Sequence, residues 1–410
     1  MPEPVYILGG AQSDFARSLT KDGRGLKELT AETVLACLQQ ARVDVGEVET
    51  IHVGNAFGEL FTGQAQLGAM PATAVPGLWG APAMRHEAAC ASGSVALLAA
   101  TAEIEAGRYD CALVLGVEQE RNVPGDVAAR HMGAAAHAGH EGADDRFLWP
   151  AMFARIADAY AERYGLRDEH LAAIARKNFA NARRNPQAQA RGWQFGAASF
   201  TADDAANPIV EGRLRRQDCS QVTDGAAAVI VASSRFAAAH ARRTGRTLAA
   251  FGRVAGWGHR TVGLGLADKL LRGRDEAYLF PHLRAAAYDA YRRANILGHE
   301  ALSGVETHDC FTISEYLAID HLGVTAPGES WRAIESGALE LGGALPVNAS
   351  GGLIGGGHPV GATGVRMVLD AYRQVTDSAG DYQIAGARRV LTLNLGGSTT
   401  TCVCTIVETG

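Results

Sequence analysis

A cysteine at position 90 begins the small-residue sequence Cys90-Ala-Ser-Gly. Residues 84–89 favour a strand, and the small residues after Cys90 favour a helix that runs to about Gly107. A thiol at the start of a helix lies near the positive end of the helix dipole, which favours the nucleophilic thiolate. The alternative is a buried cysteine that only packs in the core, and Cys90 taken alone favours that alternative.

A glycine-rich segment, GGGHPVGATG over 355–364, holds His358 between a glycine and a proline just before an expected helix. Dense glycines are costly in chain entropy, so a ligand or close packing must offset that cost. The glycines would also let the backbone pass close to a ligand. The alternative is a glycine-rich turn around a hydrogen-bonded histidine.

Two shorter motifs follow expected strands. The segment 308–311, His-Asp-Cys-Phe, offers a histidine, an acid and a second thiol; the alternatives are a polar turn or a zinc site, but the paired cysteine spacing of zinc sites is missing. The segment 394–397, Asn-Leu-Gly-Gly, places glycine N–H groups after a strand, where they can point at a developing oxyanion. The alternative for this segment is an ordinary turn.

All four motifs are expected at strand ends, which is where α/β folds build their sites. Two thiols, a histidine and backbone donors for an oxyanion are the groups that thioester chemistry needs. The combination therefore predicts an enzyme that transfers acyl groups, although no single motif does so.

The rest of the chain supplies the elements that must position these motifs. Strands are expected at 5–10, 48–53, 111–117, 225–231 and 390–395, and helices at 27–42, 152–164, 168–184 and 365–375. Their alternation predicts the α/β class. The order of turn, helix and strand around Cys90 returns around His358, and Val48–His52 resembles Val305–Asp309. We therefore expect an internal duplication.

Composition excludes several other classes. The net charge of −6 argues against a nucleic-acid platform. The seven cysteines are an odd number in a long chain, so a disulfide framework is not expected. No apolar segment is long enough to span a bilayer, and the first residues lack the pattern of a secretory signal, so we expect a cytoplasmic protein.

These motifs together resemble the thiolase superfamily, most closely the sterol-carrier-protein-type thiolases. Cys90-Ala-Ser-Gly resembles the nucleophile motif, Gly357-His358-Pro resembles the second block, and His308-Asp-Cys310-Phe is the form this subgroup uses. The segments 150–160 and 218–225 also resemble the subgroup, so the resemblance covers nearly the whole chain. One departure is Asn394, where most thiolases carry an acid/base cysteine; by the resemblance, Cys310 takes that role.

The resemblance implies two thiolase halves in five layers, helix–sheet–helix–sheet–helix, with an inserted loop domain. The expected units are 1–120 with 218–246, the loop domain 121–217, and 247–410. It also implies a coenzyme A thioester as substrate, no tightly bound cofactor, no metal, and a homodimer or homotetramer. Relatives in some microbes work beside small partner proteins, so an accessory protein is a candidate partner. The candidates for coenzyme A phosphate contacts are Arg183, Arg184, Arg213, Arg215 and Arg216.

The mechanism that the resemblance implies begins with attack of Cys90 on the thioester carbonyl, with His358 as the base. His308 orients His358 or a water in the same oxyanion hole, and the N–H groups of Cys90 and Gly396 form a second hole. Cys310 moves the proton at the α-carbon. Two alternatives stay open. One is a ketoacyl-synthase type of condensing enzyme, and the other is a thiolase-like lyase or non-catalytic subunit.

Overall fold

The computed structural model describes residues 3–142 and 145–410. Its main sheet has the strand order β3-β2-β4-β7-β1-β8-β11-β10-β9. The strands are β1 Val5–Gln12, β2 Thr50–Gly54, β3 Ala83–His86, β4 Cys111–Glu118, β7 Gly225–Ser233, β8 Gly252–Thr261, β9 Gly304–Thr307, β10 Arg389–Gly396 and β11 Thr401–Thr409. Strands β5 Ile209–Glu211 and β6 Leu214–Arg215 form a separate small hairpin. Every strand expected from the sequence is present.

The two halves of the main sheet repeat one pattern. In the first half β1 pairs antiparallel with β7, β7 antiparallel with β4, and β4 parallel with β2, which pairs parallel with β3. In the second half β8, β11, β10 and β9 follow the same sequence of pairings, and Val347 bridges Val305 where β3 would correspond. The expected duplication is therefore confirmed in the strand order. The short likeness of Val48–His52 to Val305–Asp309 is out of register, since Val48 precedes β2 whereas Val305 lies within β9.

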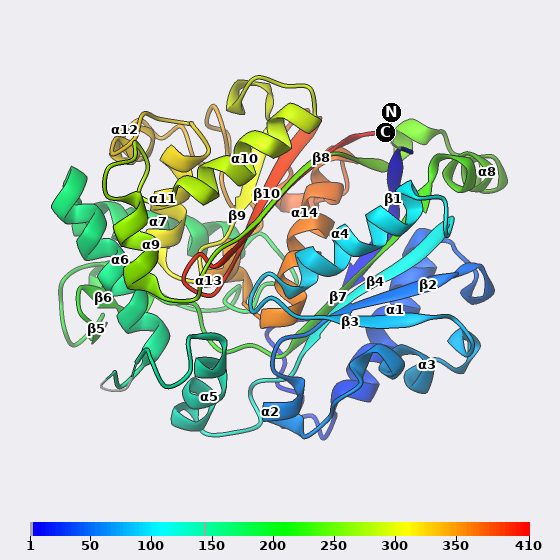
Figure 1. Ribbon diagram of the computed structural model, residues 1–410, viewed down its shortest axis with the longest axis horizontal. Coiled ribbons are helices and arrows are strands. Elements are labelled where there is room, and N and C mark those ends of the chain that lie inside the picture. Colours follow the sequence, from blue (N-terminus) through cyan, green and yellow to red (C-terminus); the bar gives the residue numbers. More distant parts are fainter. Residues whose placement is uncertain (1–2, 143–144) are drawn as a thin grey trace.

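The helices complete five layers. They are α1 Leu26–Ala41, α2 Gly58–Thr62, α3 Met70–Ala74, α4 Ser92–Glu105, α5 Gly125–Met132, α6 Leu148–Tyr164, α7 Asp168–Ala182, α8 Ser234–Thr244, α9 Leu266–Gly273, α10 Pro281–Arg293, α11 Thr312–His321, α12 Ser330–Glu335, α13 Gly352–Gly356 and α14 Thr363–Val375. Helix α1 packs on β1 and β7 of the first half, and α10 packs on β8 and β11 of the second. Helices α4 and α14 lie between the halves, and α14 contacts strands of both (Figure 1).

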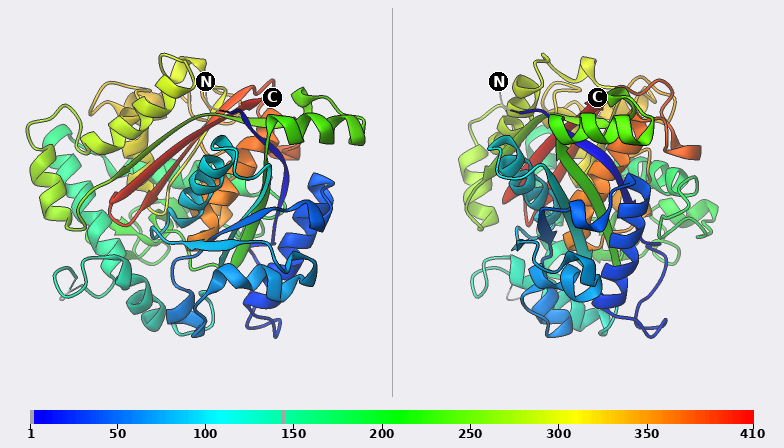
Figure 2. Two further views of the ribbon diagram at one scale, coloured as in Figure 1. Left: turned by 45° about the vertical axis from the view of Figure 1, so that its right-hand side comes forward. Right: turned by 90° about the vertical axis from the view of Figure 1, so that its right-hand side faces the viewer.

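The two half-sheets are joined at one edge. Val5–Ile7 of β1 pairs antiparallel with Gly252–Val254 of β8. The joined sheet twists around α4 and α14, whose apolar side chains form one core with both halves (Figure 2). Because the motif turns precede α4 and α14, this central layer brings the turns from the two halves together.

The segment between β4 and β7 holds α5, α6, α7 and the small hairpin. The apolar stripe of α6 is buried as its spacing predicts, and Gly165 ends the helix with φ 80°. Phe153 of α6 stacks on Phe311, and Tyr160 meets Tyr316 edge-on. The segment therefore packs against α11, immediately behind the turn that carries His308. We propose that 121–217 is an inserted unit between 1–120 with 218–246 and the second half, 247–410.

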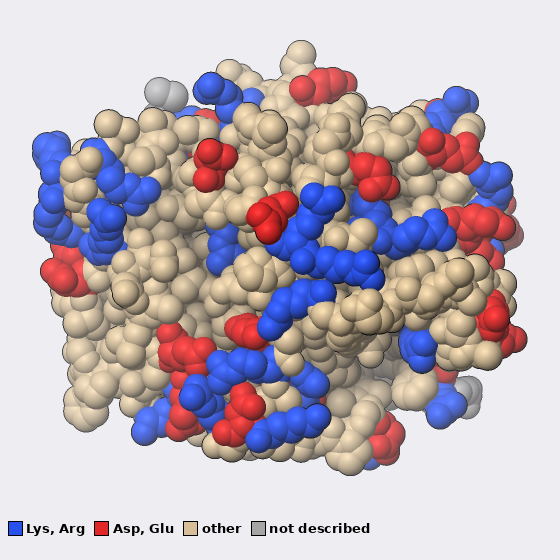
Figure 3. All heavy atoms as spheres, turned by 180° about the vertical axis from the view of Figure 1, so that it is seen from behind, with Lys and Arg blue, Asp and Glu red and all other residues tan. Residues whose placement is uncertain are grey.

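Charged side chains of both signs are interspersed on the face shown in Figure 3. Ion pairs at the surface include Arg243 with Glu47 and Arg389 with Glu408. Across the described ranges 3–142 and 145–410, none of the helices combines the length and the apolar character needed to cross a membrane.

Candidate active site

Cys90 lies in a tight turn just before α4. Ala89 adopts φ 50°, a region that non-glycine residues rarely occupy, and functional turns often hold such conformations. Ser92 holds the turn: its hydroxyl donates to the Ala89 carbonyl at 2.6 Å and accepts from the Ala88 N–H at 2.9 Å. The Cys90 side chain is half-buried and lines a pocket. The short sequence after Cys90 thus serves both to build the turn and to begin the helix.

His358 lies in the loop between α13 and α14. Its Nδ1 is 2.7 Å from the Thr363 hydroxyl, and that hydroxyl donates to the Pro359 carbonyl at 3.0 Å. Since the hydroxyl proton is used on the carbonyl, Nδ1–H of His358 must be the donor to Thr363. The proton of the neutral ring is therefore on Nδ1, and Nε2 is left free to accept one.

His308 follows β9 and has the opposite tautomer. Ser94 donates to the Asn394 Oδ1 at 2.8 Å, which fixes the orientation of that amide. The Nδ2 of Asn394 lies 3.1 Å from the Nδ1 of His308 and must donate to it. The proton of neutral His308 is then on Nε2, so this ring offers a donor where His358 offers an acceptor. The Asn394 side chain is thus a partner of His308 and not merely the site of a missing cysteine.

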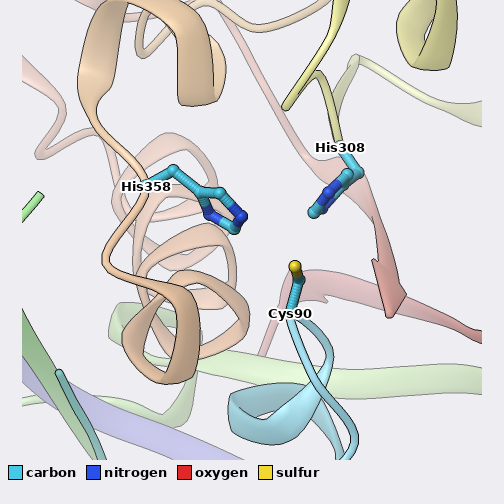
Figure 4. Close-up of side chains that lie close together, drawn as sticks. All are labelled: Cys90, His308 and His358. Atoms are coloured by element: carbon cyan, nitrogen blue, oxygen red, sulfur yellow. The ribbon is translucent and has the colours of Figure 1, made fainter. Parts of the chain in front are cut away.

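These three side chains converge from distant parts of the chain. Single atoms of Cys90, His308 and His358 all lie within 4.8 Å of one another. Figure 4 shows the Cys90 sulfur pointing toward the gap between the two imidazoles, and the two rings meet edge-on with centroids 5.3 Å apart. Cys310 lines the same pocket, whose volume is about 380 Å³. The sequence-based grouping of the four residues therefore corresponds to one place in the fold.

The resting site is uncharged. Burial, and secondly the Glu120 carboxyl, raise the pKa of the Cys90 thiol to about 12. Burial, and secondly Arg366, lower the pKa of His358 to about 3. Burial also raises the pKa of Cys310 and lowers that of His308. The expectation that the helix end makes Cys90 a ready thiolate is thus wrong for this state, because desolvation of the sulfur outweighs the helix dipole.

We predict that alkylation of Cys90 by iodoacetamide becomes about tenfold faster with each pH unit between pH 6 and 9, because only the thiolate reacts and its fraction rises with pH below the pKa. The measurement is the rate of mass gain on the Cys90 peptide, in a Cys310→Ala background that removes the other reactive thiol beside it. A rate that levels off below pH 7 would instead indicate a preformed thiolate–imidazolium pair.

The backbone around Cys90 supplies N–H donors. The backbone N–H groups of Gly397 and of Cys90 itself lie near the sulfur and lower the pKa of the thiol, against the larger effect of burial. Gly397, with φ 61°, lines the pocket, whereas Gly396 ends β10 and pairs with Thr401. The sequence named Gly396 as the second donor, and the structure adds Gly397 beside it.

The glycines before His358 are explained by close packing. A Cβ on Gly355 would lie 2.7 Å from the Ala182 side chain and from the Asn178 carbonyl, both on α7. A Cβ on Gly352 would lie 2.3 Å from a carboxylate oxygen of Asp309, which accepts from the N–H of Leu353 at 2.6 Å. Asp309 therefore ties the motif containing His308 to the loop that carries His358.

The candidate arginines separate into distinct groups. Arg216 lines the pocket. Arg213 pairs with Asp168 and Asp158, and Arg215 pairs with Asp204. Arg184 is exposed, and Arg183 borders a separate hollow beside Phe179.

Gly397, Glu120 and Cys219 all line the pocket. The sequence analysis included Gly397 and Cys219 only as members of the segments 394–397 and 218–225, without a role for Cys219. Glu120 was not singled out, because no spacing pattern distinguishes it from the other acids and contacts between remote segments bring it to the pocket. The aromatic residue Trp149 also lines the pocket, whereas His137 and His140 stack on each other outside it.

Two family descriptions match the chain. Residues 5–195 match "Thiolase, N-terminal domain", and residues 268–409 match "Thiolase C-terminal domain-like". The acetyl-CoA acetyltransferase of Methanothermobacter thermautotrophicus is 31% identical over 96% of both chains. Human sterol carrier protein 2 is 27% identical over 96% of this chain and 70% of its own. The solved structure "Ltp2-ChsH2(DUF35) aldolase" covers 100% of this chain and 98% of its own, with a TM-score of 0.77 and 21% identity.

The duplicated five-layer fold, with a thiol and an imidazole before its two central helices and a second imidazole after β9, defines an acyl-transfer enzyme of the condensing class. The chain belongs to the thiolase family. It is a thiolase-type acyltransferase.

Proposed function

We propose that the protein forms an acyl-enzyme on Cys90 and makes or cleaves the carbon–carbon bond of a 3-ketoacyl-coenzyme A. The observation that carries this proposal is the convergence of Cys90, His308 and His358, one atom of each lying within 4.8 Å of the others. The hydrogen bonds at the Nδ1 atoms leave an acceptor Nε2 on His358 and an Nε2–H donor on His308. The pocket also holds Cys310, a second thiol that can move a proton without joining the acyl transfer.

In the first step the Cys90 sulfur attacks the thioester carbonyl while its proton passes to the Nε2 of His358. Because both groups are neutral at rest, proton transfer and attack occur together. The N–H groups of Cys90 and Gly396, with Gly397 beside them, would hold the oxyanion, and each such donor typically lowers the barrier by about 3–4 kcal/mol. His308 would donate its Nε2–H to the carbonyl oxygen of the second acyl group.

In the second step the coenzyme A thiolate, released when the thioester C–S bond breaks, takes the proton of Cys310. For condensation the Cys310 thiolate then deprotonates the α-carbon of an acyl-coenzyme A, the enolate attacks the acyl group, and the Cys90–acyl bond breaks as Cys90 recovers its proton from His358. In thiolysis these steps run in reverse, and the Cys310 thiol protonates the leaving enolate. Holding an enolate in a hydrogen-bonded site lowers the main barrier of either direction.

Coenzyme A thioesters enter as substrates, with no tightly bound cofactor and no metal. Although Cys90, His308 and His358 could also hold a metal ion, the tautomers fixed by Thr363 and Asn394 serve acyl transfer directly.

For the coenzyme A phosphates we propose Arg216 first, since it lines the pocket. Its guanidinium donates a hydrogen bond to the Ala206 carbonyl. Arg183, Arg184 and Arg213 are further candidates on the same inserted segment. We also propose a cytoplasmic homodimer or homotetramer. A small accessory protein is a further candidate partner, and the name of one similar structure, "Ltp2-ChsH2(DUF35) aldolase", includes a DUF35 component.

A lyase or non-catalytic subunit is the competing proposal, and the same structure is named an aldolase. A retro-aldol lyase transfers no acyl group to the protein and so needs no nucleophile. The nucleophile turn at Cys90, with a base and N–H donors aimed at the sulfur, favours acyl transfer. A ketoacyl-synthase type of enzyme would not need a second thiol such as Cys310.

A thiolysis screen tests the proposed function. Acetoacetyl-coenzyme A and longer or branched 3-ketoacyl-coenzyme A thioesters are mixed with the enzyme and free coenzyme A, and shortened acyl-coenzyme A is measured. We expect turnover with at least one thioester, together with an acyl mass on the Cys90 peptide. Cleavage without any acylated peptide under rapid quench would favour the lyase instead.

We predict that Asn394→Asp lowers kcat by about 100-fold, the effect of losing one oxyanion donor. The carboxylate would accept from His308 Nδ1–H, which moves the ring proton away from Nε2. The variant keeps the shape of the side chain, so stability followed by thermal unfolding should change little compared with activity. In a His308→Asn background the same substitution should have a much smaller effect, because no ring tautomer remains to be changed. Equal losses in both backgrounds would contradict the tautomer argument.

A further inference from the structure

Glu120 is a buried acid in the pocket with no assigned task. It follows β4, is 1% exposed, and lines the pocket together with Cys90. Its Oε1 is 3.4 Å from the N–H of Val360, two residues after His358. Its Oε2 is buried and has no hydrogen-bond partner among the described residues. A buried polar atom without a partner is uncommon and calls for a ligand or a water.

The neighbouring acids already have structural partners. Glu118 accepts from the backbone N–H groups of Ala56, Phe57 and Gly361. Asp224 accepts from the N–H groups of Leu19, Glu120 and Arg121. These two carboxyls brace the turns around the site. Glu120 has the long contact from the Val360 N–H, and the backbone of Thr223 also lies near its carboxyl, so it is held by fewer and longer contacts.

Burial raises the pKa of Glu118 to about 7, and it raises the pKa of Glu120 as well. Burial first, and then the charges of Glu118 and Asp224, raise its pKa well above the usual value. A protonated carboxyl group has an O–H to donate. When Glu120 is neutral, its charge no longer raises the pKa of Cys90, and burial alone keeps the thiol protonated. A neutral Glu120 also does not repel a thiolate that forms during the reaction.

The wall around this donor is otherwise apolar and roomy. The lining beside Cys90 includes Phe57, Ala129, Met132 and Ala135. The pocket of about 380 Å³ falls within the range of sites that bury ligands of drug size, which is much more space than an acetyl group fills. One unsatisfied donor in such a wall favours a ligand with a matching acceptor, because burying the donor against hydrocarbon leaves it without a hydrogen bond.

We propose that Glu120 determines specificity by donating a hydrogen bond to an oxygen on the acyl chain, so that the preferred substrates are 3-ketoacyl-coenzyme A thioesters with a longer acyl group that carries a ketone or hydroxyl. This inference rests on the proposed function and narrows its substrate class. The oxygen concerned is not the thioester carbonyl, which the donors around Cys90 hold.

The test compares 3-ketooctanoyl-coenzyme A with analogues that carry one ketone or hydroxyl at carbon 6 or 7. We expect kcat/KM to be at least about tenfold higher for one oxygenated analogue, because a site built to bind an oxygen disfavours the analogue that lacks it. Glu120→Leu should abolish this preference, so that kcat/KM for the oxygenated chain falls to the value for the plain chain. Glu120→Gln should keep part of the preference, since its amide can donate.

Glu105→Leu is the control, because it removes a carboxyl at the far end of α4 and should leave the preference unchanged. Equal kcat/KM for plain and oxygenated chains in the native enzyme overturns the inference, and this comparison needs no variant to fold. A preference for the oxygenated chain that survives Glu120→Leu overturns the inference too. An equal loss of kcat/KM on both substrates in this variant also overturns it, because that result would place Glu120 in the chemistry at Cys90. Failure of the proposed function is a different result: no thioester acylates Cys90 in the native enzyme.

Discussion

Replacing Cys90 by alanine should abolish the acyl-enzyme and lower thiolysis by at least about 10⁴-fold, since a covalent mechanism has no substitute for its nucleophile. The variant loses the sulfur that lies near the N–H groups of Gly397 and of position 90. It also leaves the free Nε2 of His358 with no thiol proton to accept. The turn itself should persist, because Ser92 and the backbone of Ala88 and Ala89 hold it without the thiol.

Intact-protein mass after rapid mixing with acetoacetyl-coenzyme A provides the measurement. The native enzyme should gain one acyl mass, and Cys90→Ala should gain none. Cys111→Ala, which removes a buried thiol from the far end of β4, should acylate normally. An acyl mass on Cys90→Ala at the native rate would show that another residue is the nucleophile.

Replacing Cys310 by alanine should separate the two half-reactions. The variant should still be acylated on Cys90, but carbon–carbon bond formation and cleavage should fall by about 10²–10⁴-fold, the usual contribution of a general acid or base. Cys310 is 6% exposed and lines the same pocket as Cys90. The two thiols therefore face a common space.

Isotope exchange distinguishes the two steps. Exchange of labelled coenzyme A into acetyl-coenzyme A needs only Cys90 and should continue in Cys310→Ala. Exchange of the α-hydrogens of acetyl-coenzyme A with deuterium needs the second base and should stop. Cys219→Ala, which removes another thiol of the same pocket, should lose far less. Normal deuterium exchange in Cys310→Ala would remove Cys310 from the mechanism.

Residue type and local spacing were sufficient to locate most of the elements. The apolar run at 111–117 became β4, and the stripe of Met152, Phe153, Ile156 and Tyr160 became the buried face of α6. The motifs with Cys90 and His308 were expected at strand ends and follow β3 and β9, whereas the strand expected before His358 is wrong, because that residue lies between α13 and α14. These features depend on neighbours a few residues away, so a sequence alone can determine them.

The tertiary structure decided how these groups behave chemically. The ring proton of His308 is placed by Asn394 and Ser94, which lie 86 and more than 200 residues away from it in the chain. Cys90 is neutral because packing around it removes water, and this outweighs the helix end that the sequence suggested. Burial also raises the pKa of Glu120, which favours the protonated carboxyl group that can donate a hydrogen bond. Proton positions and charge states depend on desolvation and on hydrogen bonds between remote segments, which no local pattern records.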